Sequence, residues 1–192
     1  MKRLIKQSIL LNINSPLGLQ NWMQNNIQYG YLGKDNIIRQ EINGLEFYNN
    51  YVLQSPEELL KNKYGICWDQ VELQRLVFDY LKIDNYVIYM IQNLPPNYPT
   101  HSYSVIKQNN QFYWFENSWL QFQGIHGPFD SLKIIINLVH QNAVKIDNKI
   151  EKDWSYGLLK KPQYGIGCQE YMDFAADCID YHLNDVNIRR IK

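Results

Sequence analysis

The chain has 192 residues, 45% of them apolar and 20% charged, which fits one globular domain that needs no disulfide framework to fold. The 19 basic and 19 acidic residues balance to a formal net charge of zero, which argues against a nucleic-acid-binding surface. The three cysteines show no Cys-x-x-Cys spacing, which argues against a zinc site, and their odd number favours free thiols in a reducing cytoplasm.

The N-terminal segment combines basic residues with a short apolar stretch at 9–13, which Asn12 interrupts. We expect this stretch to begin a strand or a helix, because no small-residue cleavage site of a signal peptide follows it. No run approaches the roughly 20 apolar residues of a membrane span. We therefore expect a cytoplasmic protein with one domain over residues 1–192 and no membrane partner; the oligomeric state stays open.

The first third of the chain predicts two short helices separated by a loop. Residues 17–30 place apolar side chains on one helical face, and residues 33–54 read as mostly loop because glycines and polar residues interrupt them. The motif Ser-Pro-Glu-Glu at 55–58 predicts a helix start. Its serine can cap the helix, its proline fits the first turn, and its last glutamate completes a capping box. This helix should end near Lys63.

A long apolar-periodic run from Cys67 to Lys82 predicts the best-defined helix, with a turn at Gly65 just before it. This arrangement places Cys67 at the helix N-terminus. The side chains expected to face inward recur at helical spacing: Leu73, Leu76, Val77, Tyr80 and Leu81.

Three consecutive strands should follow as an antiparallel meander. Residues 85–93 are rich in β-forming types, residues 100–106 alternate in the manner of a strand, and residues 111–119 form a very aromatic third segment. A polar hairpin turn is expected at 107–110.

The last third predicts two more helices. One covers 129–141, with Asp130 or Ser131 as the cap, and the other covers 169–183. The second helix should turn five side chains inward, Tyr171, Phe174, Ala175, Cys178 and Ile179. Residues 143–160 carry no clear pattern. Helices that flank a block of strands indicate an α+β domain, with the long helix packed on the antiparallel sheet.

Cys67 is the candidate nucleophile. A thiolate is far more reactive than a thiol, and unpaired N–H groups together with the dipole at a helix N-terminus stabilise the anion. A neighbouring histidine then serves as general base and acid, and a third polar group orients the imidazole. His101 opens the second strand and Glu116 lies near the end of the third. In a hairpin turning at 109–110, these two side chains lie opposite one another or nearly so, with Cβ atoms about 5 Å apart.

This motif order resembles the transglutaminase-like fold of the papain-type superfamily. Gly-Ile-Cys-Trp ends at Trp68, His101 has an aromatic residue two positions later, and the acid Glu116 has a tryptophan three positions later. The resemblance covers about 55–125, and the part from 143 to 192 is not assigned by it. It implies a papain-like fold and a catalytic triad of cysteine, histidine and acid at Cys67, His101 and Glu116.

One departure concerns the acid, which is a glutamate where the family pattern has aspartate. Asn117 is an alternative orienting residue, since some papain-type enzymes use asparagine; alternation along a strand allows only one of the two neighbours to face His101. The oxyanion hole would use the N–H of Cys67 and a second donor that spacing does not fix. Candidates for this donor lie upstream of the helix: Trp22, Tyr29, Tyr31 and Gln54. Trp68 is expected to pack under the helix and position it, or to contribute to the same hole.

Other reactive residue types have structural interpretations. Cys168 and Cys178 are expected to be buried apolar side chains, and Asp69 a carboxylate that the helix dipole favours. The remaining histidines have no partner at metal-ligand spacing and are expected on the surface or in packing: His126, His140 and His182. We therefore expect no metal and no cofactor.

The function implied is cysteine-dependent acyl transfer on a protein or peptide amide through a thioester intermediate. Water is the default acceptor, as in a cysteine protease or a deamidase, and an amine acceptor would make the enzyme a transglutaminase. The alternative is an inactive transglutaminase-like module that binds peptides or proteins. A weaker third hypothesis is a thiol redox sensor that pairs Cys67 with another cysteine.

Overall fold

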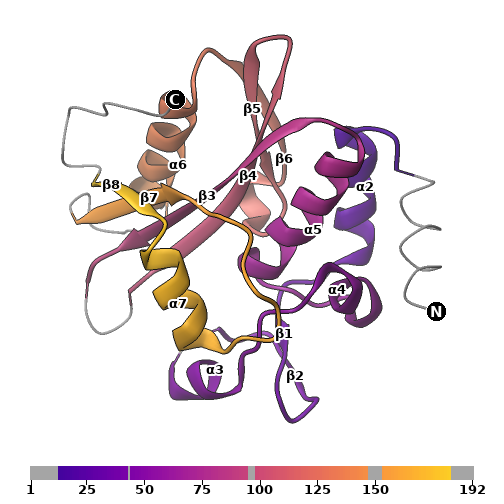
Figure 1. The fold of residues 1–192 in the computed structure, drawn as a ribbon, viewed down its shortest axis with the longest axis vertical. Coiled ribbons are helices and arrows are strands. Elements are labelled where there is room, and N and C mark those ends of the chain that lie inside the picture. The colour runs from indigo at the N-terminus through magenta and orange to yellow at the C-terminus, as the bar shows by residue number, and fades with distance from the viewer. Residues whose placement is uncertain (1–12, 43, 95–97, 147–152, 183–192) are drawn as a thin grey trace.

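The computed structural model describes residues 13–42, 44–94, 98–146 and 153–182. Its centre is an antiparallel sheet of six strands in the order β6-β5-β4-β3-β7-β8 (Figure 1). The strands are β3 (Asp84–Gln92), β4 (Thr100–Gln108), β5 (Gln111–Glu116), β6 (Gly124–Phe129), β7 (Trp154–Leu158) and β8 (Ile179–His182).

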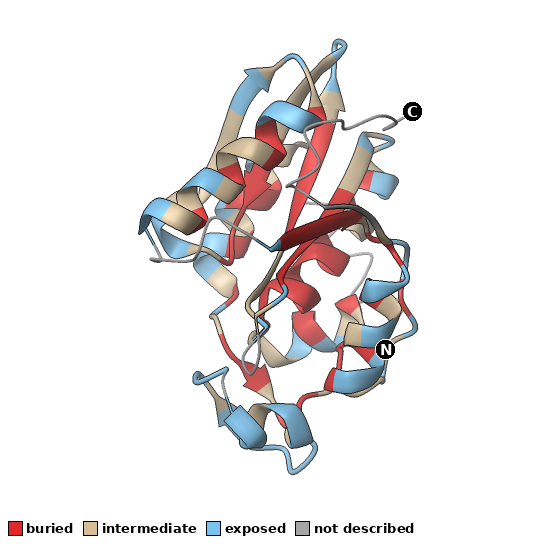
Figure 2. Cartoon of the chain, turned by 90° about the vertical axis from the view of Figure 1, so that its left-hand side faces the viewer, coloured by how far each residue is buried: buried red, intermediate tan, exposed pale blue. Residues whose placement is uncertain are grey.

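Helices cover both faces of the sheet, with α2, α4 and α5 on one side and α6 on the other (Figure 1). The helices are α2 (Pro16–Asn26), α3 (Gly44–Asn50), α4 (Pro56–Asn62), α5 (Cys67–Tyr80), α6 (Leu132–Ile146) and α7 (Cys168–Ala176). A two-stranded hairpin of β1 (Tyr31–Leu32) and β2 (Ile38–Arg39) lies apart from the main sheet. Figure 2 shows this hairpin and α3 largely in the exposed colour.

The α+β class and the packing of α5 on an antiparallel sheet, as in papain-like folds, match the expectation from the sequence. Strands β3, β4 and β5 form the expected meander. Asn109 and Asn110 make its two-residue turn with φ of 52° and 61°, a left-handed conformation that asparagine tolerates. The capping box at Ser55 and Glu58 is present, and α4 ends at Asn62.

Several predictions of secondary structure are wrong. Residues 33–54 hold β2 and α3 in addition to loop, and residues 124–129 form β6 before a helix that starts later than expected, at Leu132. The C-terminal helix stops at Ala176, and 179–182 is strand β8, not helix. Strand β6 forms by pairing with β5 and strand β8 by pairing with β7, and periodicity within one segment does not report such pairing. Tyr80 is also 52% exposed instead of facing inward. The segment at 9–12 lies outside the described residues.

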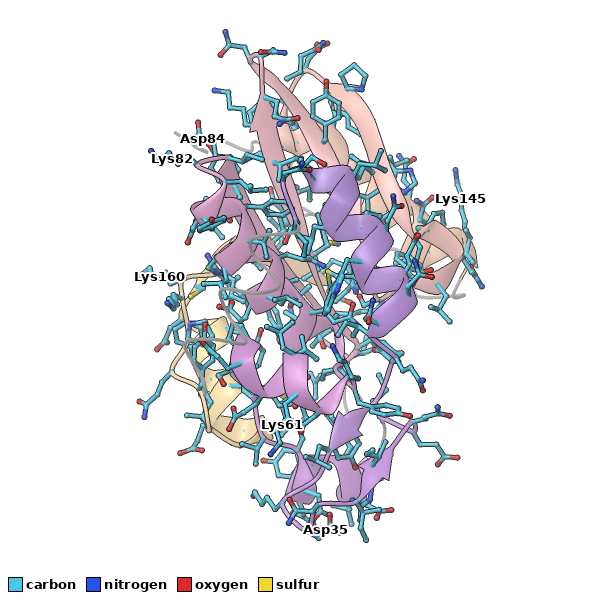
Figure 3. All side chains as sticks on the ribbon, turned by 90° about the vertical axis from the view of Figure 1, so that its right-hand side faces the viewer. Asp35, Lys61, Lys82, Asp84, Lys145 and Lys160 are labelled. Atoms are coloured by element: carbon cyan, nitrogen blue, oxygen red, sulfur yellow. The ribbon has the colours of Figure 1, made fainter. Side chains whose placement is uncertain are left out.

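Charged side chains are mostly at the surface. Figure 3 shows Asp35, Lys82, Asp84 and Lys145 at the outline of the molecule, and all four are exposed. Among the described residues, the buried charged side chains are Asp69, Glu72 and Glu116. No helix in the described ranges is long and apolar enough to cross a membrane.

Candidate active site

Cys67 is the first residue of α5 and is 5% exposed. The chain enters the helix through Gly65 and Ile66. A Cβ atom on Gly65 would lie 2.6 Å from Leu59 Cδ1 and 3.0 Å from Asp69 Cβ, so a larger residue here would require both side chains to shift. The sulfur therefore sits at a helix N-terminus held in a tightly packed turn, as the sequence predicts.

Asp69 fixes this turn from inside the helix. Its carboxylate accepts hydrogen bonds from the Ile66 N–H (3.0 Å), the Gln54 N–H (2.9 Å) and the Tyr51 hydroxyl (2.9 Å). The side chain is fully buried, and burial raises its pKa to about 7 against the opposing effect of these hydrogen bonds. Asp69 does lie in the first helical turn, and it also ties the chain at 51–54 to the nucleophile's helix.

His101 lies on β4 and pairs with Glu116, the acid of the predicted triad. Its Nε2 lies 2.8 Å from Glu116 Oε2. Burial lowers the pKa of His101, but the Glu116 carboxylate and hydrogen bonds to Cys67 and Glu116 outweigh it and raise the pKa to about 10. The imidazole is therefore positively charged at neutral pH. Its side chain is 18% exposed, so a substrate can reach it.

Glu116 is held by four donors. Oε2 faces His101, while Oε1 accepts from the Ser118 N–H (2.9 Å), the Ser118 hydroxyl (3.0 Å) and the Trp119 N–H (3.0 Å). Burial raises the pKa of Glu116, but His101 and these hydrogen bonds outweigh it and hold the pKa below its usual range. A carboxylate with every oxygen engaged is ionised and fixed in direction.

The hairpin register explains how His101 and Glu116 meet. Ser104 pairs with Phe115, so the same register continued by one step sets Glu116 level with Tyr103. His101 is two residues further along the same face of β4. The pair is thus diagonal and not directly opposite, and the glutamate side chain spans the offset.

Asn117 faces away from His101, as alternation requires. Its Nδ2 donates to Gln70 Oε1 (2.8 Å), and its Oδ1 accepts from Gln20 Nε2 (3.2 Å). Gln70 Nε2 in turn donates to the Gly65 carbonyl (2.8 Å). This buried chain, which we call the Gln70 bridge, joins the turn before Cys67 to the residue after the acid. Gln20 and Gln70 were not predicted as site residues, and the only local signal for them is the position of Gln70 one helical turn after the cysteine.

The four candidates for the second oxyanion donor have different surroundings in the structure. Gln54 uses its side-chain amide to bond the Tyr64 carbonyl (2.8 Å) and Asn62 Nδ2 (2.9 Å). Trp22 packs against the Lys63 ammonium, and Tyr31 is fully buried. Tyr29 alone among them lines the cavity beside His101.

The electrostatic environment of Tyr29 suits a hydrogen-bond donor. Burial, followed by electrostatic interactions with Cys67, Glu116 and Asp69, raises its pKa well above the ordinary value. Its hydroxyl therefore stays protonated at neutral pH and can donate to an oxyanion.

Trp68 is buried and packs beneath the start of α5. Its ring stacks on Tyr171 of α7 with centroids 4.3 Å apart, and it also meets Tyr51 edge to face at 5.3 Å. These contacts fit the positioning role that the sequence suggested for Trp68.

A cavity of about 410 Å³ opens beside His101. Its lining residues come from several parts of the chain: Tyr29, Met90, Pro99, Thr100, His101, Ser118, Trp119, Leu120, Gln121, Val139, Ala143 and Trp154. Residues of α6 and β7 were not expected at the site, and no local pattern in the sequence marks them as site residues.

The other thiols and histidines lie in structural surroundings. Cys168 and Cys178 are buried, as expected, and burial raises the pKa of Cys168 to about 11. His126 Nε2 contacts the Phe122 carbonyl at 2.7 Å. Within the described ranges, no group of three or more His, Cys, Asp or Glu side chains could hold a metal ion.

A family model described as a transglutaminase-like domain matches residues 10–122, which is more than half of the chain and includes Cys67, His101 and Glu116. No curated protein matches the chain significantly.

Proposed function

The chain belongs to the transglutaminase-like domain family, and from this membership we propose that it is a cysteine-dependent enzyme that breaks amide bonds through a thioester. One observation carries the proposal. The buried carboxylate of Glu116 holds His101 Nε2 at 2.8 Å, and Cys67, at a helix N-terminus, is near enough to the same imidazole to raise its pKa. Nucleophile, base and orienting acid are thus within reach of one another.

In the first step, Cys67 Sγ attacks the carbonyl carbon of the amide. With Nε2 held by Glu116, Nδ1 is the nitrogen of His101 left to serve the sulfur and the leaving group. The tetrahedral oxyanion accepts hydrogen bonds from the Cys67 N–H and the Tyr29 hydroxyl. The C–N bond then breaks, the nitrogen takes a proton from the imidazolium, and the acyl group stays on sulfur as a thioester.

In the second step, the acceptor loses a proton to the neutral imidazole of His101 and attacks the thioester carbon. The C–S bond breaks and Cys67 leaves as a thiolate beside the restored imidazolium. With water as acceptor, which we favour, the reaction is hydrolysis of a peptide or side-chain amide. An amine acceptor gives transamidation by the same route.

The direct test is alkylation with iodoacetamide near neutral pH, followed by mapping of the adducts. Cys67 should react at least about 10-fold faster than Cys168 and Cys178, because a thiolate is far more nucleophilic than a buried thiol. Equal rates at the three cysteines would refute the activated nucleophile.

The variant Cys67→Ala tests whether this thiol is required for activity. It should keep the fold and abolish thioester formation on peptide and glutamine amides, whereas Cys178→Ala should leave the activity intact. If the wild type forms no thioester and Cys67→Ala binds peptides as well as the wild type does, the protein is instead an inactive binding module.

A further inference from the structure

The cavity described above lies on one side of the reactive pair. Its lining includes His101 and Tyr29 but not Cys67. In the proposed reaction Cys67 keeps the acyl group, while the imidazole transfers protons to and from the nitrogen or oxygen on the other side of the carbonyl. A group seated in the cavity is therefore attached to the nitrogen of the amide, or to the acceptor that replaces it.

Apolar side chains make up most of the cavity wall. Met90, Val139 and Ala143 are almost completely buried, and Trp119 and Leu120 are further apolar residues of the lining. None of the lining residues is Asp, Glu, Lys or Arg.

The one charged group in the lining already has a counter-ion. Glu116 neutralises His101, and both oxygens of that carboxylate are occupied. A charged ligand group would lose its hydration in the cavity without gaining a partner, which is strongly unfavourable. An uncharged apolar group meets no such penalty and buries its surface.

We propose that this cavity is the subsite for the amine side of the reaction, and that it selects amides and acceptor amines carrying an uncharged apolar or aromatic group. The inference rests on the proposed function, since it needs a thioester at Cys67. A volume of about 410 Å³ falls in the range of small-molecule sites and accommodates a ring-sized group. An apolar amine seated there gives its proton to His101 and attacks the thioester carbon. The C–S bond breaks, and Cys67 leaves as the thiolate.

The test separates this inference from the proposed function. Cys67 is acetylated with p-nitrophenyl acetate, and the acetyl-enzyme is offered benzylamine, glycine or ethylenediamine in competition with water. We expect benzylamine to intercept the thioester at least about 10-fold more efficiently than the two amines that carry an additional charged group. Equal interception by the three amines, after correction for their intrinsic reactivity, would overturn the subsite. Failure to detect acetyl-Cys67 by mass spectrometry would instead overturn the proposed function.

Two exposed leucines provide matched variants. Leu120 lines the cavity and is 68% exposed, while Leu17 on α2 is 61% exposed and outside the lining, so neither substitution disturbs the core. Leu120→Glu should remove most of the preference for benzylamine, and Leu17→Glu should leave it unchanged. The same benzylamine preference in both variants would contradict the placement of the subsite.

A second variant fills the cavity from α6. Ala143→Phe should reduce benzylamine interception by about 10-fold or more, provided that circular dichroism shows the wild-type fold. A folded Ala143→Phe protein with undiminished benzylamine interception would also argue against the subsite.

Discussion

At the scale of single residues, the acid of the proposed triad is a glutamate for a geometric reason. Oε1 is occupied by the turn at Ser118 and Trp119, and Oε2 reaches a histidine that lies two residues along the neighbouring strand. Aspartate is one methylene shorter and cannot hold the turn and the imidazole together from the same backbone position. The departure from the family pattern thus follows from a diagonal pairing in the hairpin.

Substitution of Glu116 tests its orienting role. Glu116→Gln keeps the size but removes the charge, so kcat should fall on the order of 10³ to 10⁴-fold, the scale expected when a triad loses its orienting carboxylate. Glu116→Asp keeps the charge but not the reach, and it should still lose more than about 10-fold. Full activity of Glu116→Gln in a steady-state amide hydrolysis assay would exclude this role.

The interaction between His101 and Glu116 predicts that the stability of the fold depends on pH. The pKa of His101 rises from 6.5 to about 10 on folding. Its contribution to the free energy of unfolding is therefore complete below pH 6.5 and is lost as the pH rises through 10. The pKa of Glu116 falls below 4.5, so its contribution is present above that pH. The free energy of unfolding of the wild type should exceed that of Glu116→Gln most between these limits. Urea titrations should show the difference shrinking from pH 6.5 to pH 10, and a constant difference would contradict the coupling.

At the scale of elements, local signals in the sequence were enough for α4, α5 and the hairpin of β4 and β5. A capping box, a helical period and an asparagine turn each act within a few residues, and the hairpin also brings His101 to Glu116. Strand β7 forms by pairing with β3, and β8 by pairing with β7 across the intervening α7, so no local signal marks them. Gly124, Gly127 and Pro128 in β6 even disfavour a strand by propensity. The Gln70 bridge and the walls of the cavity escaped prediction for the same reason, since they join elements that are distant in sequence.

The Gln70 bridge links the two elements that carry nucleophile and acid. Gln70→Ala should lower kcat about 10-fold or more with little change in KM, because a small displacement of Cys67 from His101 costs rate. Gln74 is a matched control, since it is equally buried on α5 but bonds Ser104 on β4. Both variants should lose about 1–3 kcal/mol of stability. Equal kcat values for the two would show that the bridge is structural only.

At the scale of the whole molecule, the described residues after the stretch matched by the family model pack directly against that stretch. β7 pairs with β3 in the middle of the sheet, and Arg75 of α5 donates to the Leu159 carbonyl at 2.8 Å. Tyr171 of α7 stacks on Trp68, the neighbour of the nucleophile. The C-terminal part therefore packs against the helix that carries Cys67, and it also contributes Trp154 to the cavity lining.

Substitution of Tyr171 tests how much the packing of α7 contributes to stability. Tyr171→Ala removes a fully buried ring and should lower the free energy of unfolding by about 3–5 kcal/mol, as for other large-to-small aromatic substitutions. It should also slow alkylation of Cys67. Tyr80→Ala, at a residue that is 52% exposed, should change stability by no more than about 0.5 kcal/mol. A similar small effect of both substitutions in chemical denaturation would mean that α7 contributes little to the fold.

The origin of the cavity walls has a practical consequence. The proposed bond-breaking residues lie within 67–116, whereas Val139, Ala143 and Trp154 come from a later stretch that the family model does not match. The proposed reactive residues thus lie in the matched stretch, whereas one part of the cavity lining comes from outside it. Grafting a different α6 and β7 onto the same scaffold offers a route to redirect such an enzyme toward other amines without altering its reactive centre.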